Sequence, residues 1–118
     1  MTLRVTHEKP VYIRISEVIA DAILAGQYSD GDSLPSVRAL AADQGANPLT
    51  VAKAYQGFQD AGLIVVKRGV GLFVAPGART KLRATERDRF IKTEWPAVAA
   101  RMAQLGIDPA HLLSGELA

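Results

Sequence analysis

Apolar residues recur every three or four positions from Pro10 to Gly26, which predicts one amphipathic helix. Proline suits the first position of a helix, and glycine suits the residue that ends it. The apolar residues of this stretch share one predicted face: Val11, Ile15, Val18, Ile19, Ala22 and Ile23. We expect this face to be buried and assign no chemistry to the helix.

Two shorter helical patterns follow, and a turn of three or four residues separates them. Ser36 is a strong N-cap for the first, which should end near Gly45. Asn47 is a strong N-cap for the second, Pro48 suits its first position, and the pattern continues to about Asp60. Two helices joined by a short glycine-containing turn predict a helix-turn-helix.

The second helix of this pair has two contrasting faces. One is apolar at helical spacing: Val51, Ala54, Tyr55, Phe58 and Ala61. The opposite face carries short or polar groups around one cation: Leu49, Thr50, Lys53, Gln56 and Gly57. Such a face suits entry into a DNA major groove, with donors near the helix N-terminus. An ordinary helix with a solvated polar face is the alternative interpretation.

A β-hairpin is predicted after the second helix. Apolar runs at 63–66 and 72–75 flank a link that contains Lys67, Arg68 and Gly69. Glycine can adopt the positive φ that a tight turn needs, and two cations at the tip suit a wing lying on phosphates or in a minor groove. A solvated basic turn is the alternative. A very short strand at 34–35 is expected to cover the edge of this hairpin.

The segments around these elements carry weaker predictions. Residues 1–9 are expected to form an arm or a short extended piece in which Leu3 and Val5 alternate. Between the first two helices, Asp30 and Asp32 flank a glycine in a turn. The aspartate spacing and distal glutamate of a calcium loop are missing, so no metal site is predicted.

The tail, 78–118, begins with an excess of basic residues: Arg79, Lys81, Arg83, Arg87, Arg89 and Lys92. We expect these to lead into a helix capped by Thr85, either solvated or near phosphates that flank a DNA site. Pro96 should either kink this helix near Lys92 or begin a new helix capped by Thr93. Gly106 should end it, and Asp108 should begin a last short helix.

Large apolar residues of the tail follow a heptad-like spacing, which predicts a narrow seam. The predicted dimerisation residues are Ile91, Trp95, Val98, Met102 and Leu105. A tail this short cannot bury them all by itself, so they should pack on a second copy, on the preceding domain or on both. A ligand pocket lined by Trp95 is the sharper alternative.

Composition limits the domain organisation and the expected compartment but does not identify the function. The 118 residues fit one small domain, 1–77, and an appendage, 78–118. No long apolar run or secretion signal is found, and the chain has no cysteine, so a reducing cytoplasm is the expected compartment. The net charge is +2, but residues 1–77 carry equal numbers of basic and acidic side chains. Global charge therefore does not identify a DNA-binding protein.

No catalytic arrangement competes with DNA binding. His7 and His111 lie in opposite terminal segments, and the glycines at 69 and 71 lack the strand-to-helix context of a nucleotide-binding loop. We therefore expect no enzyme activity and no cofactor, and nothing indicates a small-molecule effector.

Four ordered blocks of the sequence resemble the GntR family of bacterial transcription regulators. They are Leu34–Ala41, Asn47–Tyr55, Gly62–Ile64 and Gly69–Val74. The second block and the short tail resemble the YtrA-type branch. The resemblance implies DNA contacts by the arginine of the first block, by polar residues of the recognition helix and by the basic hairpin tip. Leu49 departs from the branch, which commonly has a polar residue there.

The interpretation is therefore an α+β fold: a winged helix-turn-helix followed by a short α-helical dimerisation tail. The candidate DNA-binding residues are Ser36, Arg38, Asn47, Leu49, Thr50, Lys53, Lys67, Arg68 and Gly69. Leu49 could make an apolar contact with a thymine methyl group. The resemblance implies a homodimeric repressor on a palindromic operator, with helix 48–60 in the major groove and wing 64–75 on the minor groove or backbone.

Two other functions remain open. A winged-helix module that binds proteins without reading DNA is supported by the neutral charge of residues 1–77. The DNA-binding front of a longer aminotransferase-like protein is less favoured, because the sequence ends in a predicted helix.

Overall fold

The computed structural model describes residues 9–115. It divides the chain into two compact units, Met1–Leu82 and Arg83–Ala118. The expected N-terminal arm with Leu3, Val5 and His7 lies outside the described residues.

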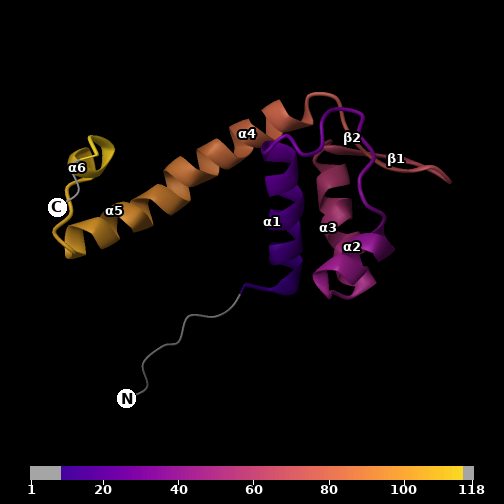
Figure 1. Cartoon of the computed structure of the whole chain (residues 1–118), viewed down its shortest axis with the longest axis horizontal. Helices are drawn as coiled ribbons and strands as arrows, with labels where there is room; N and C mark the ends of the chain where they lie inside the picture. Colours follow the sequence, from indigo (N-terminus) through magenta and orange to yellow (C-terminus); the bar gives the residue numbers. More distant parts are fainter. Residues whose placement is uncertain (1–8, 116–118) are drawn as a thin grey trace, which may run out of the picture. The chain divides into compact units, whose positions relative to one another are not determined.

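The first unit contains the three predicted helices, α1 (Val11–Leu24), α2 (Val37–Gln44) and α3 (Pro48–Asp60) (Figure 1). The predicted buried face of α1 is only partly correct. Ile15, Ile19 and Ile23 are buried, but Val11 is 42% exposed and Val18 is 37% exposed. The buried stripe therefore runs at a spacing of four residues, and the two valines lie on its exposed margin.

Both predicted N-caps of the helix-turn-helix are present. The Ser36 Oγ accepts a hydrogen bond from the Ala39 amide at 3.1 Å, and the Asn47 Oδ1 accepts one from the Leu49 amide at 2.8 Å. Gly45 ends α2 with φ +61°, a left-handed conformation that glycine adopts at little cost. These three residues confirm the helix-turn-helix.

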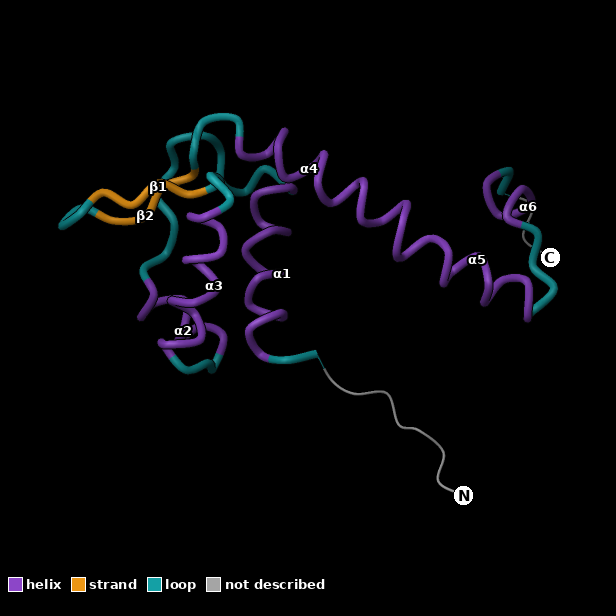
Figure 2. The backbone as a smooth tube through the Cα atoms, turned by 180° about the vertical axis from the view of Figure 1, so that it is seen from behind, coloured by secondary structure: helices purple, strands orange, loops and turns teal. Residues whose placement is uncertain are grey.

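The predicted hairpin is formed by β1 (Ile64–Lys67) and β2 (Gly71–Val74), which pair antiparallel (Figure 2). The segment before α2 lies along the free edge of β2, where Ser33 bridges Phe73 and the Leu34 amide donates to the Leu72 carbonyl at 2.8 Å. In place of the edge strand expected at 34–35, the structure has a single bridge at Ser33.

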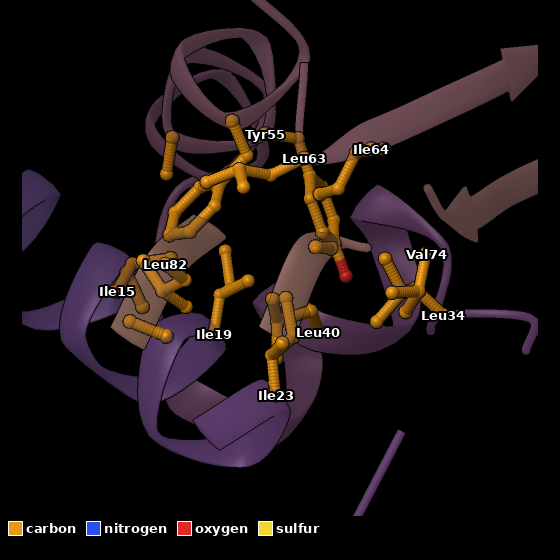
Figure 3. Close-up of a cluster of buried hydrophobic side chains, with 14 of the residues drawn as sticks. Ile15, Ile19, Ile23, Leu34, Leu40, Tyr55, Leu63, Ile64, Val74 and Leu82 are labelled. Atoms are coloured by element: carbon orange, nitrogen blue, oxygen red, sulfur yellow. The ribbon is translucent and has the colours of Figure 1, made fainter. Parts of the chain in front are cut away.

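The core of the first unit joins all three helices to the base of the hairpin (Figure 3). Ile23, Val51 and Val74 are its most completely buried large side chains. Within it, the Tyr55 hydroxyl donates to the Pro35 carbonyl oxygen at 2.7 Å, which connects α3 to the start of α2.

Burial, and to a smaller extent the neighbouring Tyr28, raises the pKa of Tyr55 to about 12. The phenol therefore stays protonated in the folded protein after it has begun to ionise in the unfolded chain. Its contribution to stability is complete below pH 10 and is lost as the pH rises from there towards 12.

Helix α4 (Ala78–Arg89) begins seven residues before Thr85, so the predicted cap at Thr85 is wrong. Ala78 and Leu82 are buried in the core of the first unit, and the Gly77 amide donates to the Asp30 carboxylate at 2.9 Å. Tertiary contacts thus start the helix early. The first unit ends at Leu82, beyond the expected boundary at residue 77.

The second unit continues α4 into a π-helical turn, η1 (Phe90–Glu94), then α5 (Trp95–Gln104) and α6 (Pro109–Leu113). Thr93 does not cap a new helix, because the backbone at Glu94 remains helical, with φ −80° and ψ −45°. The wider π turn instead accommodates Pro96, whose ring would clash with a regular preceding turn. Gly106 follows the end of α5 with φ +69°, and Asp108 caps α6, as predicted.

Candidate nucleic-acid interface

The candidate DNA-binding residues lie at three places in the first unit. Two are on or beside the first turn of α2, four are on or beside the N-terminal half of α3, and three are at the end of the hairpin. The hairpin projects from the helical part of this unit (Figure 1). Helix ends and a projecting hairpin are the elements with which winged helices contact DNA.

At α2, Ser36 and Arg38 are both exposed. The Ser36 hydroxyl oxygen is engaged as the N-cap, but its own proton remains available to a phosphate oxygen. Arg38 is the second residue of the helix, beside the unsatisfied amides of its first turn. A guanidinium next to a helix N-terminus is a suitable anion-binding arrangement.

At α3, the N-cap residue and the residues of the first turn differ in hydrogen bonding and exposure. Asn47 uses its Oδ1 in the cap, which leaves its side-chain amide group as a donor. Thr50 is half-buried. Leu49 is 79% exposed, so the fold does not use its side chain for packing. Such an exposed leucine at the start of a helix is available for an apolar contact outside the protein.

Lys53 lies further along the exposed face of α3, and its ammonium group is 5.0 Å from the centre of the Tyr12 ring. This distance is within the range of a cation–π interaction. Tyr12 belongs to α1, and no pattern in the sequence connects it with the recognition helix. Only the tertiary contact between α1 and α3 identifies it.

In the hairpin, Lys67 is the last residue of β1 and its ammonium group lies 4.7 Å from the centre of the Phe73 ring. Arg68, Gly69 and Val70 form the connecting loop. Gly69 has φ +76°, which confirms the turn role predicted for it. The tip therefore presents Arg68 and the exposed Val70, while Lys67 is held against the strand.

The electrostatics of these elements support binding to a polyanion. Arg38, Lys53, Lys67 and Arg68 are all exposed. Within residues 9–115, none of the four forms an ion pair with a carboxylate. Their charges therefore remain available, although the basic and acidic residues of this part of the chain balance in number.

The predicted seam of the tail is exposed at four of its five positions. Ile91, Trp95, Val98 and Leu105 are between 39% and 55% exposed, whereas Met102 is 8% exposed. Met102 is thus already buried in its own protomer. The other four are exposed among the described residues 9–115, and exposed large apolar side chains mark a candidate interaction surface.

Residues 9–115 contain neither a metal-binding cluster nor a membrane-spanning helix. No three acidic or histidine side chains there are grouped so that they could hold a metal ion. No helix in that range is long and apolar enough to cross a membrane.

Comparisons with known proteins agree with this geometry. The family model described as "Bacterial regulatory proteins, gntR family" matches residues 11–74. The transcriptional repressor YtrA of Bacillus subtilis is 35% identical over 108 residues, covering 92% of this chain and 76% of that protein.

Solved structures extend the similarity to the fold. A GntR family transcriptional regulator from Listeria monocytogenes superimposes with a TM-score of 0.74 at 29% identity, covering 93% of this chain and 95% of that one. The DNA-binding domain of AraR, solved in complex with the operator ORR3, superimposes with a TM-score of 0.60 at 27% identity, over 64% of this chain and 90% of that one.

Proposed function

Because the chain belongs to the GntR family of bacterial regulatory proteins, in its YtrA-type branch, we propose that it is a repressor that binds a palindromic operator as a homodimer. The fold of the first unit and the position of its cations carry the proposal. This unit has the fold of the operator-bound AraR domain, and its exposed, unpaired cations lie on the elements that contact DNA in winged helices. The proposal places the protein in the cytoplasm, with the chromosome.

In the proposed complex, the N-terminal half of α3 enters the major groove. Lys53 and the side-chain amide of Asn47 are donors for base edges, while Thr50 and the helix amides face phosphate. Arg38 and Ser36 of α2 hold the adjacent phosphates. The hairpin tip, with Arg68 and Gly69, lies on the minor groove or the backbone.

Dimerisation through the second unit would bring the DNA-binding surface of a second copy into the complex. The exposed residues of the seam, Ile91, Trp95, Val98 and Leu105, would pack against the same residues of a partner. A two-fold dimer presents two recognition helices at a fixed spacing, which matches the symmetry of a palindrome. No small-molecule effector is required by this arrangement.

An electrophoretic mobility shift series on the region upstream of the protein's own gene tests the function. We expect a shift at submicromolar protein that depends on the DNA sequence and weakens steeply as salt is raised. A protein-interaction module with a winged-helix shape would give no sequence-dependent shift, and that result would refute the proposal.

Lys53→Ala and Lys67→Ala should weaken binding in different ways. Lys53 should read a base edge, so its loss should lower the specific affinity by about 1–3 kcal/mol and relax the preference at one position of the site. Lys67 should act through phosphate, so its loss should lower the affinity similarly for all sequences and reduce the salt slope by about one. Fluorescence anisotropy across a salt series measures both effects. Unchanged affinity in either variant would remove that residue from the interface.

Leu49 should contact the methyl group of one thymine. Replacing that thymine by deoxyuridine removes only the methyl group and should weaken binding of the parent protein by about 1 kcal/mol. The same replacement should have no effect on Leu49→Ala, which has already lost the contact. The test exchanges each thymine of a half-site in turn. Equal responses of parent and variant at every position would refute the contact.

A further inference from the structure

The side chain of Tyr12 joins α1 to the exposed face of the recognition helix. The two helices lie side by side in both views of the backbone (Figures 1 and 2). Tyr12 is partly buried and packs against the core of the first unit, so α1 fixes the position of its ring. The Lys53 ammonium lies over this ring, 5.0 Å from its centre. An otherwise flexible lysine is therefore held by a rigid neighbour.

Gly57 provides the second observation. It lies four residues after Lys53, on the same side of α3. A glycine inside a helix lowers helix stability, so its presence there needs a reason. A Cβ atom built at this position would lie 3.3 Å from the Tyr12 hydroxyl oxygen, closer than an ordinary contact. The missing side chain therefore leaves room for the Tyr12 hydroxyl group, at the tip of the ring, to lie close against α3.

We propose that Tyr12 is a positioning residue for DNA recognition: its ring holds the Lys53 ammonium in the direction in which it meets DNA, and Gly57 makes the space for that ring. This inference rests on the proposed function. A lysine loses rotamer freedom when it is fixed at an interface, and this loss opposes binding. A lysine that is already held against a ring loses less of that freedom when it binds.

Substitutions of Tyr12, with and without Lys53, test this role through operator affinity. Tyr12→Leu should weaken binding about two- to fivefold, because it removes the aromatic face. Tyr12→Phe keeps that face and should bind like the parent. In a Lys53→Ala background, Tyr12→Leu should have no further effect. An equal loss in Tyr12→Phe, a loss that persists without Lys53, or a gain of affinity in Tyr12→Leu would each overturn the proposal.

A measurement without DNA separates this proposal from the proposed function. The ring current of Tyr12 should shift the Lys53 ε-proton resonances upfield in the free parent protein, and Tyr12→Leu should abolish that shift. Operator binding without an upfield shift in the parent would overturn the positioning role and leave the function standing. An upfield shift in a protein that binds no operator would overturn both.

Gly57→Ala is a second variant that leaves Tyr12 and Lys53 in place. Alanine favours the helix, so the protein should not unfold more readily. The added Cβ should displace the Tyr12 ring, reduce the upfield shift of Lys53 and weaken operator binding. Unaltered affinity together with a reduced upfield shift would overturn the proposed role of the ring.

Discussion

In the proposed homodimer, Val98→Asp should separate the two copies and lower the operator affinity roughly a hundredfold or more. Val98 lies on α5, about one turn after the exposed Trp95, and is 45% exposed in one copy. Burying an aspartate against the same residue of a partner would place two carboxylates in an apolar interface, which is costly. Sedimentation equilibrium would measure the association, and anisotropy titration would measure the affinity.

The loss of affinity follows from linking two weak binding events. Each first unit carries few cations, so a single copy should bind a half-site weakly. A dimer makes the second binding event intramolecular, with an effective concentration set by its geometry. A monomeric variant should therefore still bind a half-site, with the affinity of one recognition surface.

Ala100→Asp is the matched control. It introduces the same charge into α5, but Ala100 lies on the side of the helix opposite Val98 and is exposed. We expect it to remain dimeric and to bind the operator like the parent. If Val98→Asp were also dimeric, or monomeric with full operator affinity, the seam would have no part in recognition.

The helix-turn-helix could be predicted because its signals are local. Ser36, Gly45 and Asn47 act on amides within a few residues of themselves, and the structure places each in the predicted role. The hairpin could be predicted for the same reason, because Gly69 and its flanking strands are adjacent in sequence. Such features depend on backbone geometry more than on the rest of the fold.

The sequence predictions are wrong where contacts between segments far apart in the chain determine the local structure. Thr85 is a good cap by its chemistry, but α4 begins earlier because Ala78 and Leu82 find space in the core. The hydrogen bond that the Gly77 amide donates is accepted by the carboxylate of Asp30, 47 residues away. No local pattern shows that contact. Helical periodicity also could not show that Val18 lies at the margin of the core.

In the candidate interface too, local sequence predicts some features, whereas others depend on tertiary contacts. Residue type and spacing were enough to place Lys53 on the exposed face of α3, and the structure has it there. They could not show that Tyr12 of α1 lies beneath its ammonium group, or that Lys67 lies against Phe73. Nor could they show that Met102, predicted to lie in the seam, is only 8% exposed in one copy of the chain.

Leu82→Ala should lower the free energy of unfolding of the first unit by about 2–5 kcal/mol. Leu82 is 5% exposed and lies beyond residue 77, where the sequence placed the end of this domain. The expected loss combines the buried surface of the leucine with the cavity left behind. Urea denaturation followed by circular dichroism, at equal protein concentration, measures it.

Leu49→Ala is the control for that measurement, because it is the same substitution in the same unit at a side chain that is 79% exposed. Its effect on unfolding should stay within about 0.5 kcal/mol. The two variants should thus show opposite patterns, since Leu82 is buried in the core and Leu49 is proposed to contact DNA. A Leu82→Ala protein as stable as the parent would mean that α4 contributes nothing to the core, and that the DNA-binding domain ends at the hairpin after all.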